Sequence, residues 1–412
     1  MKWYADAMET PSKSSGKWRN VLVSFLGLKK NMVALFSMVI LVGLGEKMAE
    51  RFLPLYLIAL GGGAFSVGLL NGMDNLLSAL YSYPGGYLSD KIGYKKSLLL
   101  FNAAAITGYL IVIIFPYWQA VVVGAVFFLS WTAVSLPATM DMVSRVLPKN
   151  KRTMGVSMHS LMRRIPMALG PLLGGIMIGL FGTETGIRLA FAAALVLGGV
   201  SLILQQIMIT EDTQKPRSPE RNPLRAVTLI NPALRNLLVS DILIRFCEQI
   251  PYAFVVLWCV TRNGITPLQF GALTTIEMVT AMIIYIPVAY AADKSTKKPF
   301  IVITFSFFTL FPPLLLFSRS FGLMVVAFII RGLKEFGEPA RKALIMDLAP
   351  EGKKAGTFGT YYLLRDSVVS LAAFGGAFLW NTSPKTNFLT AFIFGILGTV
   401  FFAVFGRDTR PS

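Results

Sequence analysis

Long runs of apolar residues recur along the whole chain, separated by short polar connections. A helix needs about 20 mostly apolar residues to cross the hydrocarbon of a bilayer. Several runs are apolar on every side rather than along one stripe, which is the pattern of helices that face lipid. The pattern predicts twelve membrane-spanning helices, at residues 32–58, 66–88, 97–115, 118–145, 153–180, 187–209, 235–260, 268–291, 299–317, 321–348, 355–379 and 386–405.

The runs lack the strict alternation of a membrane β-barrel, and open sheet edges do not occur in hydrocarbon. We therefore predict an all-α membrane protein. The composition agrees, because 54% of the residues are hydrophobic and 15% are charged, against about 25% charged in a typical soluble domain.

The formal net charge of +18 would suggest a nucleic-acid partner in a soluble protein. Here 24 of the 39 basic residues fall in tails and connections on one side of the expected membrane. The other side holds four, namely Arg188, Arg262, Arg319 and Lys385. By the positive-inside rule, both termini and the central loop are expected in the cytoplasm. The charge then reports topology and needs no nucleic acid.

The second half of the chain repeats the first at an offset of 202 or 203 residues. Acid falls on acid, proline on proline and arginine on arginine at this offset, which coincidence in an apolar sequence does not readily produce. The matching pairs are Glu46 with Glu248, Gly68 with Gly271, Asp74 with Glu277, Pro84 with Pro287, Asp90 with Asp293, Pro137 with Pro339, Pro148 with Pro350 and Arg163 with Arg365. The repeat predicts two pseudo-symmetric six-helix bundles around a central cavity.

The expected organisation has five parts. A cytoplasmic tail at 1–31 contains a basic, aromatic segment that could lie in the membrane interface. The two six-helix bundles cover 32–210 and 235–406. A cytoplasmic linker rich in Pro and Arg spans 211–234, and a short cytoplasmic tail covers 407–412.

The connection between the second and third spans reads Gly86-Tyr87-Leu88-Ser89-Asp90-Lys91-Ile92-Gly93-Tyr94-Lys95-Lys96. It resembles the signature loop of the major facilitator superfamily, with Tyr94 at a position where that family usually has a basic residue. The resemblance implies the major facilitator fold of twelve transmembrane helices. It also implies that Gly86, Asp90, Gly93, Lys95 and the repeat-related Asp293 form a conformational switch. The alternative to a switch is a solvated turn whose basic residues only reflect the positive-inside rule.

The fifth span contains Gly170-Pro171-Leu172-Leu173-Gly174-Gly175. This run resembles an element of the family's antiporters that is associated with exporters. Small residues allow two helices to approach closely, so simple packing explains Gly170, Pro171, Gly174 and Gly175 equally well. The arginine that the family's drug/proton antiporters carry early in the fourth span is missing from Val121–Trp131.

Ionisable residues inside a membrane are costly and mark functional sites. Glu46 and Asp74, with their repeat partners Glu248 and Glu277, offer each half a pair of carboxylates towards the cavity. A carboxylate desolvated there can take up and release a proton near neutral pH, which makes these four residues our candidates for proton coupling. Permanent ion pairing with Lys47, Arg51 or Arg245 is the alternative.

The tenth span carries six charged residues within about 120° of arc on a helical wheel: Arg331, Lys334, Glu335, Glu338, Arg341 and Lys342. We expect this stripe to pair with Arg365 and Asp366 in the eleventh span. Together with Arg51, Arg163 and Arg164, these charges predict either a site for an anionic substrate or lipid head group, or a network that locks the cytoplasmic gate.

These features favour a secondary active transporter that exports a small organic or amphipathic solute in exchange for protons. Transport of an organic anion or anionic lipid is the first alternative, and a membrane sensor or scaffold without transport is a weaker one. No catalytic motif points to an enzyme. We expect a monomeric, integral multi-pass protein of the cell (inner or plasma) membrane, with lipids, a small-molecule substrate and protons as partners and no cofactor or metal.

Overall fold

The computed structural model describes residues 30–129, 131, 135, 139, 152–209, 230–293, 295–350 and 354–408, and all regular structure in these ranges is helical. The first half contains α2 (Lys30–Glu50), α3 (Leu53–Ala59), α4 (Gly63–Ile92), α5 (Tyr94–Ile114), α6 (Trp118–Phe128), α8 (Arg152–Phe181) and α9 (Thr183–Met208). The second half contains α10 (Pro232–Tyr252), α11 (Phe254–Leu257), the π-helix η3 (Trp258–Arg262), α12 (Pro267–Asp293), α13 (Lys298–Phe317), α14 (Phe321–Leu333), α15 (Glu338–Leu348), α16 (Lys354–Thr382) and α17 (Pro384–Phe405). The all-α expectation is confirmed.

The helix bounds follow the apolar runs closely, and α5, α8, α12, α13 and α17 begin and end within three residues of the predicted spans. Eight of the described helices are long and apolar enough to cross a membrane, and α10 with the bent α11–η3 segment adds a ninth if the pair is one span. The count of twelve stays a prediction. Most of the fourth expected span beyond α6, and the expected interfacial helix, lie outside the described residues.

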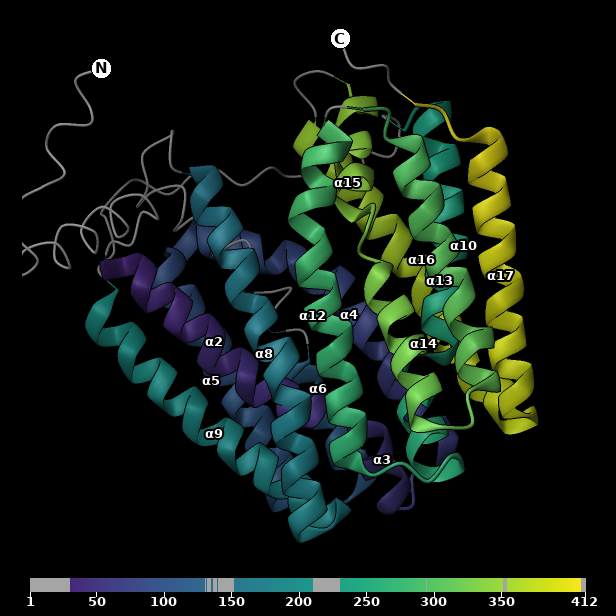
Figure 1. Ribbon diagram of the computed structural model, residues 1–412. Coiled ribbons are helices and arrows are strands. Elements are labelled where there is room, and N and C mark those ends of the chain that lie inside the picture. The colour runs from purple at the N-terminus through teal and green to yellow at the C-terminus, as the bar shows by residue number, and fades with distance from the viewer. Residues whose placement is uncertain are drawn as a thin grey trace, which may run out of the picture.

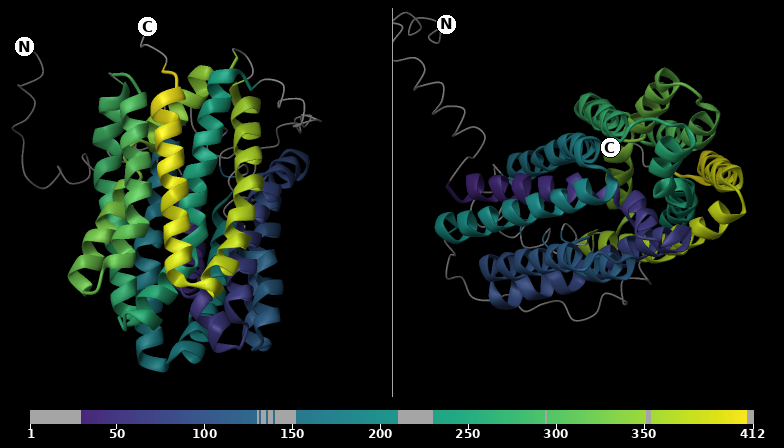
Figure 2. Two further views of the ribbon diagram at one scale, coloured as in Figure 1. Left: turned by 90° about the vertical axis from the view of Figure 1, so that its right-hand side faces the viewer. Right: turned by 90° about the horizontal axis from the view of Figure 1, so that it is seen from below.

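The sequence repeat reappears in the packing of the helices (Figures 1 and 2). In the first half α2 packs against α8 and α9, and in the second half α10 packs against α16 and α17. Likewise α5 lies on α9, and α13 lies on α17. The halves meet along α8 with α12 and along α4 with α16. The two bundles are therefore pseudo-symmetric in three dimensions as well as in sequence.

Glycines hold equivalent helices together in the two halves. A Cβ added to Gly174 would lie 2.0 Å from the carbonyl oxygen of Met48, and one added to Gly376 would lie 2.4 Å from that of Ile250. Both pairs are related by the offset of 202. Since any side chain at either glycine would force the helices apart, a close approach of equivalent helices depends on the same small residue in both bundles.

The first helix of each half breaks at the same point. The break between α2 and α3 falls at Arg51 and Phe52, and the break between α10 and α11 falls at Ala253, which is 202 residues after Arg51. The α10 segment bends there by 42°. These breaks place Arg51 and Tyr252 at the ends of helices rather than along a continuous wall.

Two sequence expectations are wrong in detail. The tenth span is not one helix, because residues 334–337 form a turn between α14 and α15. Gly337 lies so close to the Phe300 carbonyl that a Cβ would be 2.3 Å from it, and Pro339, at the start of α15, has no N–H to donate. The signature motif is also not a loop: residues 86–92 continue α4, and Gly93, with φ of 85°, alone separates α4 from α5.

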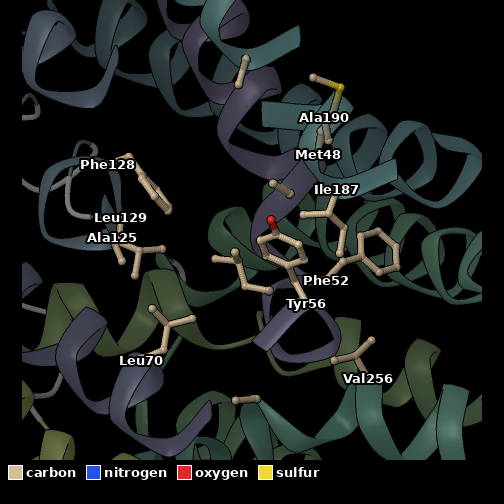
Figure 3. Close-up of a cluster of buried hydrophobic side chains, with 14 of the residues drawn as sticks. Met48, Phe52, Tyr56, Leu70, Ala125, Phe128, Leu129, Ile187, Ala190 and Val256 are labelled. Carbon is tan, nitrogen blue, oxygen red and sulfur yellow. The ribbon is translucent and has the colours of Figure 1, made fainter. Parts of the chain in front are cut away.

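Apolar packing closes the end of the molecule that holds α3. Figure 3 shows Phe52, Tyr56, Leu70, Phe128 and Val256 gathered there from different helices, and all five belong to one buried cluster. The ring of Phe52 also meets Phe270 of the second half edge-on, with centroids 5.8 Å apart. Towards the opposite end, α2 and α9 incline away from the second half (Figure 1). The halves thus pack closely at the end that holds α3 and diverge towards the other end.

Candidate functional site

A cavity of about 1240 Å³, including the solvent at its mouth, lies between the two halves. Its wall combines α2, α4 and α8 with α10, α12 and the segment around α15. Lys342 of α15 lies at the open end, where its side chain is 47% exposed. Seven basic and five acidic residues line the cavity: Lys47, Arg51, Arg163, Arg164, Arg245, Lys334 and Lys342, and Glu50, Asp74, Glu248, Glu277 and Glu335.

A largely apolar pocket of about 520 Å³, including the solvent it opens to, adjoins this cavity on the side of α3. Glu50, Arg51, Asp74 and Tyr252 line both spaces. The combined site is therefore strongly charged at its open end and apolar at its closed end, with these four residues at the boundary.

The carboxylates of the second half are neutralised by nearby cations. Glu248 accepts from Arg245 at 2.6 Å and from Lys334 at 2.8 Å. Glu277 lies 3.3 Å from Arg331 and 3.4 Å from Lys334. Glu248 and Glu277 each face two cations. For these two residues the structure therefore has the ion pairing that was the alternative to proton coupling.

A second charged group lies behind this one and is centred on Asp241, a residue that is not among the candidates drawn from the sequence. Arg341 donates to its carboxylate at 2.5 Å, Arg365 lies 3.4 Å away, and the Tyr361 hydroxyl donates at 3.0 Å. Asp241 and Arg341 are both 1% exposed. This group lies off the cavity wall and within the second bundle.

The remaining charges of the expected stripe connect these groups. Glu338 accepts from Arg341 at 2.8 Å and from Arg245 at 2.7 Å. Arg365 also donates to Asp366 at 2.7 Å. The charged residues of the tenth span therefore pair mainly with α10 and α12, whereas the sequence pointed to Arg365 and Asp366 as their partners.

The first half pairs its charges less completely. Glu46 lies 3.1 Å from Lys47, which also forms an ion pair with Glu50, and Glu46 is buried away from the cavity wall. Asp74 does line the cavity. Within the part of the chain that the structure describes, Asp74 forms neither an ion pair nor a side-chain hydrogen bond.

The difference between the halves follows from the repeat. At the offset of 202, Arg245 corresponds to Gly43 and Arg331 corresponds to Leu129. The first half therefore lacks two of the cations that neutralise Glu248 and Glu277. Asp74, the counterpart of Glu277, faces the cavity without them.

Two arginines on the cavity wall have no carboxylate partner among the described residues. Arg51 lies over the ring of Tyr252, with its guanidinium carbon 5.0 Å from the ring centroid. Arg163 lines the same space from α8. An arginine that faces water beside an aromatic ring remains available to bind an anionic group.

Polar contacts between the halves surround the cavity. Arg164 lies 3.3 Å from Glu335 across the open end. Asn71 donates to the backbone oxygen of Gln249 at 3.1 Å, and Asn75 donates to the Gln249 side chain at 3.2 Å. Gln249 and Tyr252 were not selected from the sequence, since uncharged polar residues near a helix end give no distinctive signal there.

The glycine-rich element of α8 contacts both halves. Gly170 and Gly174 lie against Lys47 and Met48 of α2, while Gly175 lies against Pro267 at the start of α12. Pro171 in turn faces Gly271 of α12, where a Cβ would meet its carbonyl oxygen at 2.5 Å. The element thus fixes α8 within its own bundle and lets it approach α12 closely.

The expected conformational switch is only partly described. Lys95 donates to the backbone oxygen of Gln206 at 3.1 Å and so ties α5 to α9. Gly86 and Asp90 lie in the last turns of α4, and Asp293 ends α12, but the side chains of Asp90 and Asp293 lie outside the described part of the chain.

A family model described as Major Facilitator Superfamily matches residues 35–262 and 237–412. An uncharacterized MFS-type transporter of Methanocaldococcus jannaschii is 23% identical over 385 residues, which cover 90% of this chain and 93% of the relative.

Solved transporters share the fold at low sequence identity. The nucleoside transporter NupG aligns with a TM-score of 0.77 at 12% identity, over 91% of this chain and 100% of NupG. A POT family transporter in complex with 5-aminolevulinic acid gives 0.75 at 14% identity, over 91% and 96% of the two chains. The human organic anion transporter MFSD10 gives 0.64 at 16% identity, over 90% and 98%.

Proposed function

The chain belongs to the Major Facilitator Superfamily of membrane transporters, and from that premise we propose a secondary active transporter that exchanges protons for a small organic or amphipathic solute. Access to the central cavity alternates as one bundle rocks against the other. The observation that carries this proposal is a cavity built from both halves, charged at its open end and apolar at its closed end.

Proton coupling is assigned to Asp74 in preference to the other three carboxylates. Glu248 and Glu277 each face two cations, so protonating either would leave a surplus of buried positive charge. Glu46 lies off the cavity and beside Lys47. Asp74 faces the cavity without an ion pair in the described part of the chain, and its protonation removes an isolated charge from the site.

Export is supported by the cavity's opening and by the α8 element. The cavity opens at the end that holds α15. The distribution of basic residues favours a cytoplasmic location for this end and for both termini, in a protein of the cell membrane. A solute could therefore enter from inside the cell. Gly175 packs closely against the start of α12 at the seam between the halves, where a Cβ would lie 2.6 Å from the Pro267 carbonyl oxygen.

Transport of an organic anion or anionic lipid is the second candidate. It is favoured by Arg51 and Arg163, which line the cavity without a carboxylate partner in the described chain. Arg331, Arg341 and Arg365 support it less, because each is already paired with Glu277 or Asp241. The similar fold of MFSD10, a protein described as an organic anion transporter, is consistent with this candidate.

The test uses purified protein in liposomes that enclose a pH-sensitive dye, challenged with cationic, neutral, zwitterionic and anionic solutes. Solute-driven proton movement that Asp74→Asn abolishes supports the proposal. Asp347→Asn is the matched control, because this carboxylate pairs with Lys297 away from the cavity and should leave proton movement unchanged. If no solute class drives proton movement, antiport is contradicted. If only anionic solutes are transported, and without proton movement, the second candidate is favoured.

A further inference from the structure

The boundary between the charged cavity and the apolar pocket presents one cation and one carboxylate that are not paired in the described chain. Both Arg51 and Asp74 line the two spaces. The other charged residues that line the apolar pocket are paired, Glu50 with Lys47 and Arg331 with Glu277. Arg51 is held in place by the ring of Tyr252 at 5.0 Å rather than by an acid.

The pocket beyond this boundary is lined mainly by apolar residues, most of which come from three helices. Leu53 and Pro54 come from the start of α3, Val67 and Leu70 from α4, and Val255 and Val256 from α11. The charged residues that line this pocket are few, and apolar side chains form most of its wall. The closed end thus suits an apolar group joined to a polar head at the boundary.

We infer that the transported solute is an apolar zwitterion, with an anionic group at Arg51, an ammonium group at Asp74 and its apolar part in the pocket. This inference rests on the proposed transport function and narrows its substrate class. A singly charged solute would neutralise one of the two residues and leave the other facing an apolar group without a counter-ion, which is costly where the bound solute displaces water from that residue. A site that binds a polar group strongly rejects the analogue that lacks it.

The inference is tested by calorimetric binding to the purified full-length protein with two matched sets of compounds. One set is L-phenylalanine, its amide, which keeps only the ammonium, and its N-acetyl form, which keeps only the carboxylate. The other set is the dipeptide leucylphenylalanine with the same two modifications, and glycine serves as the zwitterion without an apolar group. The free zwitterion of at least one set should bind at least tenfold more tightly than both of its blocked forms and than glycine.

Two substitutions assign the groups. Arg51→Gln should make the zwitterion and the amide bind equally, since the carboxylate has then lost its partner. Asp74→Asn should make the zwitterion and the N-acetyl form bind equally. Asp347→Asn should keep the wild-type ranking. The inference is overturned if a blocked form binds as tightly as its zwitterion, if neither zwitterion binds, or if the ranking survives both substitutions.

Failure of this inference is distinct from failure of the proposed function. If an N-acetylated or amidated compound drives proton movement in liposomes better than its zwitterion, transport stands and the zwitterion site is wrong. If a zwitterion binds as described but no solute moves protons, the binding site stands and antiport is wrong.

Discussion

Arg341 donates to Asp241 at 2.5 Å in the interior of the second bundle, and the two side chains are each 1% exposed. A buried ion pair of this kind contributes little over an apolar pair of the same shape, but removing one partner leaves an uncompensated charge. Asp241→Asn should therefore lower the free energy of unfolding by about 3–5 kcal/mol, measured by thermal or denaturant unfolding in detergent. Lys342→Ala, which removes an exposed cation 4.0 Å from Glu338, should change it by less than about 1 kcal/mol. If both variants lost the same free energy of unfolding, Asp241 would not be the residue that holds this buried charged group together.

Gly174 and Gly179 lie on the same helix but differ in what surrounds them. A Cβ on Gly174 would lie 2.0 Å from the Met48 carbonyl oxygen, whereas nothing lies within 4 Å of one on Gly179. Gly174→Ala should destabilise the protein by about 1–3 kcal/mol because α8 must move away from α2. Gly179→Ala should be neutral or stabilising by up to about 1 kcal/mol, since alanine favours the helix. The comparison is made by thermal unfolding, and destabilisation of both variants alike would show that helix packing is not the cause.

Arg164 and Glu335 connect the two halves across the open end of the cavity at 3.3 Å. Reversing either charge alone should slow transport and change the accessibility of the cavity, because a like-charge contact then opposes closure at this end. The double variant Arg164→Glu with Glu335→Arg should recover part of the loss. We expect a coupling energy of about 1 kcal/mol in a double-mutant cycle on transport rates, as both side chains are partly exposed. Additive losses would mean that the pair does not act as a gate.

Tyr252 positions Arg51 through its ring rather than through its hydroxyl. Tyr252→Leu should weaken binding of the transported solute about 2- to 30-fold, which corresponds to the loss of a cation–π contact. Tyr252→Phe keeps the ring and should bind the solute nearly as well as the unchanged protein. Binding constants for one solute in the three proteins give the comparison, and equal weakening by both substitutions would assign the effect to the hydroxyl.

The sequence predicted many of the helix bounds well because long apolar runs mark membrane helices. The run predicted at 299–317, for example, is α13, Lys298–Phe317. It did not predict the turn at residues 334–337, since that turn depends on the contact of Gly337 with Phe300 of a different helix. The sequence repeat correctly related the helices of one half to those of the other, and it placed Asp74 and Glu277 at equivalent positions. It could not show that Glu277 is neutralised while Asp74 is not, because the cations responsible come from other helices.

Asp241 shows a second limit of the sequence. It is a carboxylate in an apolar run, so the cost of an intramembrane charge already marked it as unusual. Its partners Arg341 and Arg365 lie 100 and 124 residues further along the chain, and no spacing rule connects them. Its counterpart at the offset of 202 is Val39, so a search for acids shared by both halves passes over it.

The unequal pairing of the two bundles bears on how such a molecule can change its specificity. Substitutions around Glu248 and Glu277 disturb several cations at once and endanger folding, so that bundle has little freedom to vary. Around Asp74 and Arg51 a single exchange alters the charge offered to a solute and leaves the rest of the wall in place. New substrates would therefore be acquired mainly through the first half, while the second half preserves the frame against which it moves.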